Sequence, residues 1–335
     1  MLLKTAIHRI AIKGRPQLKH RENVLVTGGA GFIGSHLIDQ LMQEGHNVTA
    51  LDNLTSGSLT NLERWVDHPR FMFVKADLKA AENIREIIKN PSVIFHFAAN
   101  PEVRIGETEP QVHFKENLGA TFNLLEAVKT IASVKSLVFS STSTVYGRAS
   151  VLPTPEKYAP LIPISTYGAS KLGCEALIGS YVNTFGSRAL ILRMANIVGA
   201  RSKHGVVIDF VKKLQENPTV LEILGDGNQN KSYMHITDCV DAILHLTNTL
   251  KERVEIYNIG SFDQIKVKKI ADVVAEEMKL KNVRYEFKAG TDDGAGWKGD
   301  VKTMHLSIEK LTETGWRPKY TSERAIRDAA RSLLA

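Results

Sequence analysis

Short apolar runs alternate with longer amphipathic segments over the first 200 residues of this 335-residue chain. The runs that we expect to be buried strands are residues 23–27, 47–51, 71–75, 93–97, 136–141 and 188–193. Apolar positions three or four residues apart predict helices up to Gly45 after the first run, and at about 80–90, 110–132 and 166–185. Later helices are expected at 205–216, 237–250 and 266–279. Repeated strand–helix units predict an α/β fold with a doubly wound parallel sheet, with ligands at the carboxyl ends of its strands.

A glycine-rich turn, Gly28-Gly29-Ala30-Gly31-Phe32-Ile33-Gly34, joins the first strand to a helix. Glycines permit the tight turn and let a pyrophosphate approach the backbone, while the helix N-terminus offers unpaired N–H groups. Asp52 ends the second strand 18 residues after Gly34, where a carboxylate accepts from a ribose 2′-hydroxyl and repels a 2′-phosphate. No basic residue follows in Asn53-Leu54-Thr55, so NAD is favoured over NADP.

Tyr167 and Lys171 stand one turn apart on the predicted helix 166–185. A free tyrosine titrates near roughly 10, and an adjacent ammonium should lower that pKa by favouring the phenolate. A neutral-pH base needs a shift of about three units, or about 4 kcal/mol, which one ammonium and a cationic cofactor in a dry site could supply. A tyrosine four residues before a lysine usually has no function, and the upstream nucleotide fingerprint is what makes this pair a candidate.

Charge and cysteine content exclude several classes of protein. The net charge of +7 resides almost wholly in residues 1–21, which carry six basic and no acidic residues, so the remaining 37 basic residues face 36 acidic ones and nucleic acid is not expected as a partner. We interpret residues 1–21 as a loosely ordered N-terminal extension. No apolar run approaches the length of a membrane span, no metal ligand set is expected, and the two cysteines, Cys174 and Cys239, suit buried positions in a cytoplasmic protein. His96, within an apolar strand, is expected to be a core histidine.

Taken together, the sequence motifs resemble those of the extended short-chain dehydrogenase/reductases. They are Thr27–Gly34, Asp52-Asn53, Asp77-Leu78, Phe97-Ala98-Ala99, Ser140-Ser141-Thr142 and Tyr167 with Lys171. Within this superfamily the chain looks most similar to the NAD-dependent nucleotide-sugar 4-epimerases of the UDP-glucose 4-epimerase type, over about residues 22–330. The resemblance implies an isomerase with a UDP-sugar substrate, and a homodimer formed through the helices near 110–132 and 166–185.

The resemblance also implies roles for individual residues. Tyr167 matches the catalytic base, Lys171 the residue that holds the nicotinamide ribose, and Thr142 a hydroxyl bonded to the reacting sugar oxygen. The implied cofactor contacts, besides Tyr167 and Lys171, are Gly28, Gly31, Phe32, Ile33, Gly34, Asp52, Asn53, Leu54, Asp77, Leu78, Phe97, Ala98, Ala99, Asn117, Ser140 and Ala195. The implied substrate contacts are Thr142, Asn196, Lys231, Lys298 and Met304.

The implied domain organisation has three parts. Residues 1–21 form the extension, and residues 22–190 plus about 233–260 form a Rossmann-type NAD-binding domain. A smaller C-terminal α/β substrate-binding domain takes about 191–232 plus 261–335.

Several positions depart from the family pattern. Lys231 stands where arginine is common, and Trp297-Lys298-Gly299-Asp300 replaces a stretch that often reads Arg-Pro-Gly-Asp, so that phosphate binding there either passes to Lys298 or is lost. The active-site loop reads Thr142-Ser143-Thr144, whereas related dehydratases resemble Thr-Asp-Glu and related decarboxylases Thr-Ser-Glu. Because the loop carries no carboxylate, the sequence favours epimerisation over dehydration.

Other functions stay open at this point. They are a nucleotide-sugar dehydratase or reductase, a dehydrogenase such as the related L-threonine dehydrogenases, and a non-catalytic NAD-binding regulator. Which UDP-sugar is bound is also open among the hexose, its N-acetylated form and the uronic acid.

Overall fold

A seven-stranded parallel sheet forms the centre of the computed structural model, which describes residues 18, 21–80, 84–88, 90–288, 290–291 and 294–334. Its strands in spatial order are β11 (Val254–Ile259), β6 (Arg188–Met194), β5 (Ser136–Thr142), β4 (Val93–His96), β1 (Asn23–Thr27), β2 (Asn47–Asp52) and β3 (Phe71–Lys75). All neighbouring pairs run parallel. The predicted doubly wound fold is therefore confirmed, and the strand order reverses beside β1.

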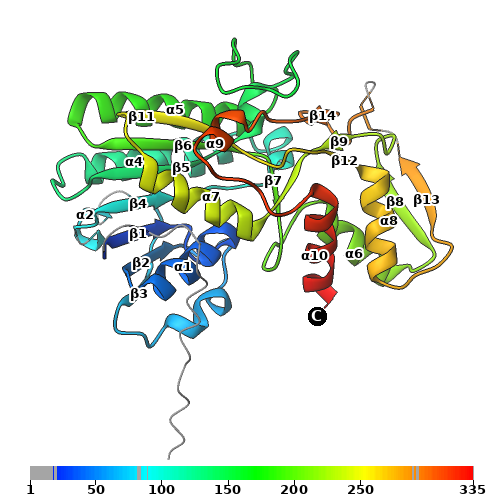
Figure 1. Cartoon of the computed structure of the whole chain (residues 1–335), viewed down its shortest axis with the longest axis horizontal. Helices are drawn as coiled ribbons and strands as arrows, with labels where there is room; N and C mark the ends of the chain where they lie inside the picture. Colours follow the sequence, from blue (N-terminus) through cyan, green and yellow to red (C-terminus); the bar gives the residue numbers. More distant parts are fainter. Residues whose placement is uncertain are drawn as a thin grey trace, which may run out of the picture.

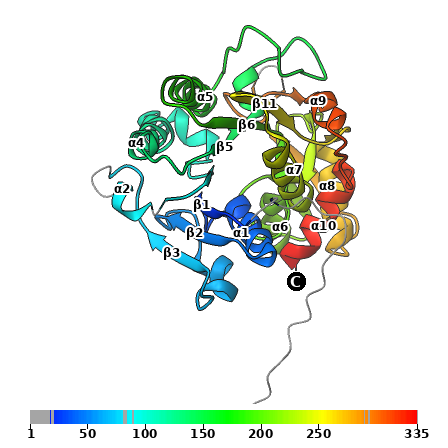
Figure 2. The same cartoon turned by 60° about the vertical axis from the view of Figure 1, so that its left-hand side comes forward.

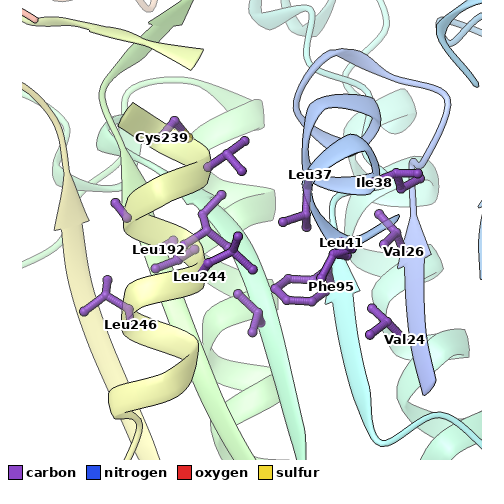
Figure 3. Packing of buried hydrophobic residues seen from close by; sticks show 14 of the residues in the cluster. Val24, Val26, Leu37, Ile38, Leu41, Phe95, Leu192, Cys239, Leu244 and Leu246 are labelled. Atoms are coloured by element: carbon purple, nitrogen blue, oxygen red, sulfur yellow. The ribbon is translucent and has the colours of Figure 1, made fainter. Parts of the chain in front are cut away.

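Helices cover both faces of the sheet, because successive strand residues point to opposite sides and both sets are apolar. Val24 and Val26 join one core with α1 (Phe32–Glu44) and α7 (Ile236–Thr249), and Figure 3 shows Leu41 and Leu244 of these helices near Phe95. The intervening Leu25 joins the opposite core under α4 (Ala120–Val128) and α5 (Thr166–Phe185). Figure 2 shows α4 and α5 on one side of the sheet and α1 and α7 on the other.

Two predicted helices differ from their expected form. The helix expected at 110–132 is divided into α3 (Gln111–His113), a π-helical turn (Phe114–Gly119) and α4. For the helix expected at 80–90, the structure describes only α2 (Ile84–Ile87), since residues 81–83 and 89 lie outside the described ranges. The N-terminal extension also lies outside them, apart from Leu18 and Arg21.

The C-terminal part builds a second, smaller assembly beside the sheet, at the right in Figure 1. Its helices α6 (Val206–Glu216), α8 (Val267–Glu277) and α10 (Ser322–Leu334) share a third apolar core with β8 (Val220–Leu224) and β13 (Arg284–Lys288). Shorter strands are β7 (Asn196–Val198) with β10 (Tyr233–His235), and β9 (Asn230–Lys231) between β12 (Ile265–Lys266) and β14 (Thr303–Met304). Helix α9 (Glu309–Glu313) contacts β11. We propose that the sheet and this assembly are the two domains expected from the sequence.

A pocket of about 770 Å³ lies between the carboxyl ends of the strands and the second assembly. Three short 3₁₀ segments also line it, namely η1 (Leu59–Trp65), η3 (Val103–Glu107) and η5 (Ser143–Tyr146). In the described ranges no helix is long and apolar enough to cross a membrane. The same ranges hold no group of three or more histidine, cysteine or acidic side chains placed to bind a metal ion.

Candidate active site

The glycine turn brings two backbone segments closer than any side chain would permit. A Cβ added at Gly28, which has φ +69°, would lie 2.7 Å from the Ala98 nitrogen, and one at Gly34 would lie 2.3 Å from the Gly28 oxygen. Gly28, Gly31 and Gly34 all line the pocket at the start of α1. An open turn at a helix N-terminus fits a pyrophosphate, as the sequence predicts.

Asp52 marks the expected ribose position at the end of β2. Its carboxylate accepts from the Ala30 N–H at 3.0 Å and from the Leu54 N–H at 2.7 Å, which fixes its orientation at the pocket wall. The Asn53 side-chain amide donates a hydrogen bond to the Asp77 carboxylate at 3.2 Å, so the two residues expected near the adenosine fix each other's side chains. The chemistry of these donors and acceptors fits NAD, because a carboxylate beside the ribose disfavours a 2′-phosphate.

Twenty of the residues proposed for the site line one pocket. They are Gly28, Gly31, Phe32, Ile33, Gly34, Asp52, Asn53, Asp77, Leu78, Phe97, Ala98, Ala99, Ser140, Thr142, Tyr167, Lys171, Ala195, Asn196, Lys231 and Met304. Leu54, Asn117 and Lys298 are not among the lining residues. Leu54 packs against the α1/α7 core, while Asn117 is buried, accepts from the Asn100 N–H at 2.7 Å and donates to the Ser170 hydroxyl at 3.0 Å. Lys298 is exposed.

Tyr167 and Thr142 interact with each other in the pocket lining. Thr142 ends β5 and caps η5, where its hydroxyl accepts from the Thr144 N–H at 3.2 Å. Burial raises the pKa of Tyr167 to about 12, and its hydrogen bond with Thr142 acts in the opposite direction. Within the protein alone, desolvation of the phenolate outweighs these favourable contacts, so the lowered pKa expected from Lys171 together with a cationic cofactor stays a prediction.

Lys171 is held in an almost dry environment on α5. Its side chain is 2% exposed, and its ammonium lies 4.5 Å from the centre of the Phe139 ring. Burial lowers its pKa to about 8, because the charged form loses its hydration. No hydrogen bond or ion pair of this ammonium is found within the described part of the chain. The residues present thus fit a bound dinucleotide, because its ribose hydroxyls would supply hydrogen-bond acceptors for the Lys171 ammonium.

His96 has the structural role that the sequence predicts. Its ring nitrogens lie 2.7 Å from the Thr27 hydroxyl and 2.9 Å from the Thr121 hydroxyl, so both are satisfied within the core. Burial lowers its pKa to about 3, which keeps the imidazole neutral. Cys174 and Cys239 are likewise fully buried and unpaired, as expected.

An aromatic residue flanked by two cations lies at the far end of the pocket. The Trp297 ring is 5.5 Å from the Lys231 ammonium and 5.7 Å from the Arg104 guanidinium. Lys231 also forms an ion pair with Asp300, so its charge is partly neutralised. Arg104 was not expected from the sequence, since only the fold brings η3 opposite the segment around Trp297.

The segment after β7 contributes further pocket residues that sequence reasoning missed. Lys203 donates to the Ser56 and Gly57 carbonyls at 2.9 and 3.3 Å, and Arg201 pairs with Asp39 at 2.8 Å. These contacts tie the second assembly to the loop after β2 and to α1. They connect residues more than 140 positions apart, and no local pattern in the sequence indicates them.

Buried polar groups behind Tyr167 were also missed, namely Glu175 and Arg193, although a usable signal existed. Glu175 is four residues after Lys171 on the same helix, and Arg193 is a charged residue inside an apolar strand. Charged residues are almost never fully buried unless they are paired, so both positions indicated a buried ion pair.

Comparison with known proteins matches residues 24–260 to the NAD dependent epimerase/dehydratase family. The putative UDP-glucose 4-epimerase of Methanocaldococcus jannaschii is 32% identical over 309 residues, which cover 91% of this chain and 96% of the relative. A solved UDP-galactose 4-epimerase superposes with a TM-score of 0.83 at 43% identity, covering 93% and 98% of the two chains. A dTDP-glucose 4,6-dehydratase from Streptomyces venezuelae, solved with NAD bound, gives a TM-score of 0.84 at 27% identity over 93% and 97%. The extent of these matches shows that the chain belongs to the NAD-dependent epimerase/dehydratase family.

Proposed function

We propose that this protein is an NAD-dependent isomerase that interconverts a UDP-sugar and its C4 epimer. The substrate is UDP-glucose with UDP-galactose, or the N-acetylated or uronic acid analogue. One observation carries the proposal: Tyr167 and Thr142 line the same pocket and interact there, beside a loop, Thr142–Tyr146, that contains no carboxylate. Tyrosine, lysine and threonine at that position support reversible oxidation at one carbon.

The side chains have separate roles in this reaction. NAD, held by the glycine turn, Asp52 and Lys171, would supply a hydride acceptor and a positive charge. Tyr167 takes the proton of the sugar 4-hydroxyl as the C4–H bond breaks, and it returns that proton to the oxygen once the hydride has come back on the other face of C4. Thr142 orients the sugar oxygen, and Lys171 stabilises the phenolate. Protons and electrons balance over the cycle, so no NADH accumulates.

The hydroxyls beside Thr142 support epimerisation rather than elimination of water. Thr144 donates its hydroxyl to the Thr142 oxygen at 3.2 Å, so the loop turns back on itself. A dehydratase needs an acid and a base near C5 and C6 of the sugar in addition to the groups that oxidise C4. Ser143 and Thr144 are too weakly acidic for that task, and Glu175 is held by Arg193 behind the loop.

We further propose a homodimer that works in the reducing cytoplasm. Phe114, Phe122 and Phe185 are 64%, 44% and 51% exposed on the π-helical turn, α4 and α5. Phe122 and Phe185 both contact Tyr181, so α4 and α5 present one aromatic face. Such faces are typical of protein–protein contacts. Both cysteines are unpaired, which suits a reducing compartment.

Proton NMR of the purified protein with UDP-glucose, UDP-N-acetylglucosamine and UDP-glucuronate in turn tests the function. The expected result is the C4 epimer of one of them at a constant final ratio, with NAD at catalytic concentration and no build-up of NADH. A keto-deoxy product would instead establish a dehydratase, and stoichiometric NADH a dehydrogenase. No change in any of the samples would refute epimerisation of these substrates.

A further inference from the structure

A buried ion pair joins α5 to β6 directly behind the active site. The Arg193 guanidinium donates to both oxygens of Glu175, with Nε–Oε1 at 3.0 Å and Nη2–Oε2 at 2.7 Å. The two side chains are 4% and 6% exposed. The same carboxylate accepts the Ser141 hydroxyl, so it binds the end of β5 as well.

The remaining donors of Arg193 extend this network to two further elements. Its Nη1 lies 3.1 Å from the Tyr146 hydroxyl and 3.1 Å from the Glu156 carbonyl oxygen. Tyr146 in η5 donates in turn to the Asn258 side chain of β11 at 2.7 Å. One arginine thereby links α5, β6, the loop after η5 and, through Tyr146, β11.

An ion pair in this place is not explained by stability. Two charges taken out of water lose hydration that their attraction only partly returns, and apolar residues of the same volume often stabilise a core at least as well. The pair instead lies where catalytic geometry is set. Ser141 directly precedes Thr142, and Glu175 follows Lys171 by one helical turn.

Glu175 also bears on Lys171 electrostatically. Its negative charge acts to raise the pKa of Lys171, against the stronger effect of burial. Cys174, on the same helix, also acts to raise the pKa of Lys171. His96 on β4 is a further titratable neighbour of Lys171. Without Arg193, Lys171 would be the cation left to compensate the Glu175 carboxylate.

We propose that Glu175 and Arg193 are positioning residues for catalysis, an inference that rests on the proposed epimerase function. The Glu175 carboxylate holds the Ser141–Thr142 end of β5 against the helix that carries Tyr167 and Lys171. Arg193 neutralises that carboxylate in an ion pair, so that the Lys171 ammonium stays directed to the pocket and available to the cofactor ribose.

Three variants separate the two functions of the pair: Arg193→Met, Glu175→Gln and the double variant. Arg193→Met leaves Glu175 unpaired beside Lys171, and we expect the dissociation constant of NAD to rise about tenfold and kcat to fall about a hundredfold, with KM within about threefold. The double variant removes both charges and frees Lys171. Its NAD affinity should return to within about threefold of wild type, while kcat stays reduced because the Ser141 contact is lost.

Titration calorimetry with NAD gives the first readout without any sugar substrate, so it is independent of the proposed reaction. Arg193→Lys is the conservative variant, and it tests the same inference if Arg193→Met does not fold. It keeps the charge but loses the bidentate contact, so NAD affinity should be retained and kcat reduced. The matched control is Arg327→Met with Glu277→Gln, an arginine–glutamate pair between α10 and α8 whose side chains do not line the pocket, and for which NAD affinity and kcat should not change.

Two results would overturn the inference: Arg193→Met with wild-type NAD affinity and kcat, or a double variant that binds NAD no better than Arg193→Met. Failure of the proposed function gives a different pattern. In that case wild-type protein yields no epimer, while the calorimetric differences among the variants persist. Wild-type epimerisation without those differences would refute the positioning role alone.

Discussion

Lys171 shows that a residue proposed to function in catalysis can lower the stability of the fold that contains it. Burial lowers its pKa to about 8 from 10.5, so the folded protein binds fewer protons than the unfolded chain between those pH values. The contribution of Lys171 to the free energy of unfolding therefore rises with pH between about 8 and 10.5. At pH 7, where the lysine is charged in both states, its burial costs on the order of 3 kcal/mol.

Lys171→Met should for that reason stabilise the NAD-free protein at pH 7, by about 1–3 kcal/mol. The gain should diminish between pH 8 and pH 10.5, because the wild-type lysine becomes neutral there. Urea unfolding of both proteins at pH 7 and pH 10 measures the difference. A variant less stable than wild type at pH 7 would contradict the assignment of Lys171 as a desolvated charge.

Tyr167→Phe should reduce turnover by about a thousandfold while NAD binding is retained, because the phenyl ring keeps the packing and loses only the proton acceptor. Turnover is measured by NMR on whichever UDP-sugar the proton NMR test identifies as the substrate, and NAD content by release on denaturation. Tyr158→Phe is the control, since its hydroxyl bonds to exposed Ser150 outside the pocket lining. Unchanged turnover in Tyr167→Phe would remove Tyr167 from the mechanism.

At the scale of elements, the junction of β1 and α1 shows how backbone proximity creates a binding site. The helix begins where the Gly34 backbone passes the Gly28 carbonyl, with no room for even one methyl group. A similar constraint does not apply to every helical glycine. Nothing lies within 4 Å of a Cβ built at Gly179 in α5.

Gly34→Ala and Gly179→Ala should consequently have opposite effects. The first forces α1 away from the turn, and NAD affinity should fall at least tenfold, as measured by titration calorimetry. The second should leave NAD binding unchanged and raise stability by about 0.5–1 kcal/mol, since alanine favours the helix over glycine. Equal NAD affinity in the two variants would show that the close approach at Gly34 is not required.

At the scale of the whole molecule, the pocket exists because two assemblies face each other. The sheet brings Tyr167, Thr142 and the glycine turn, and the second assembly brings Lys231 and Trp297. Direct contacts such as Arg201 with Asp39 hold the two parts together. The outer face of α4 and α5, where the second copy of the proposed dimer would bind, lies on the other side of the sheet from α1 and α7 (Figure 2).

Phe122→Glu combined with Phe185→Glu should therefore convert a dimer to a monomer, because two charges would be buried in the aromatic face of α4 and α5. Light scattering after size-exclusion chromatography reports the mass. Phe262→Glu with Phe287→Glu, at exposed positions of 56% and 46% outside α4 and α5, is the control and should remain dimeric. A monomeric wild-type protein would refute the dimer outright.

The sequence by itself determined the fold class and the cofactor turn, and it predicts the catalytic set. These features depend on local patterns: apolar runs of strand length, glycines between a strand and a helix, and Tyr167 one turn before Lys171. Each pattern reports on neighbours within a few residues, where backbone geometry dictates the arrangement. The loop Thr142-Ser143-Thr144 likewise indicated by its composition alone which chemistry to expect.

Only the tertiary structure decided the environment of those residues. Burial raises the Tyr167 pKa in the protein alone, because desolvation depends on everything packed around the phenol. Arg104 meets Trp297 across elements distant in the chain, and Arg193 meets Glu175 where β6 packs against the preceding helix α5. Such pairs arise from strand order and from the docking of two assemblies, which local periodicity does not encode. The sequence therefore predicts the reacting groups, and the fold sets their charge, contacts and distances.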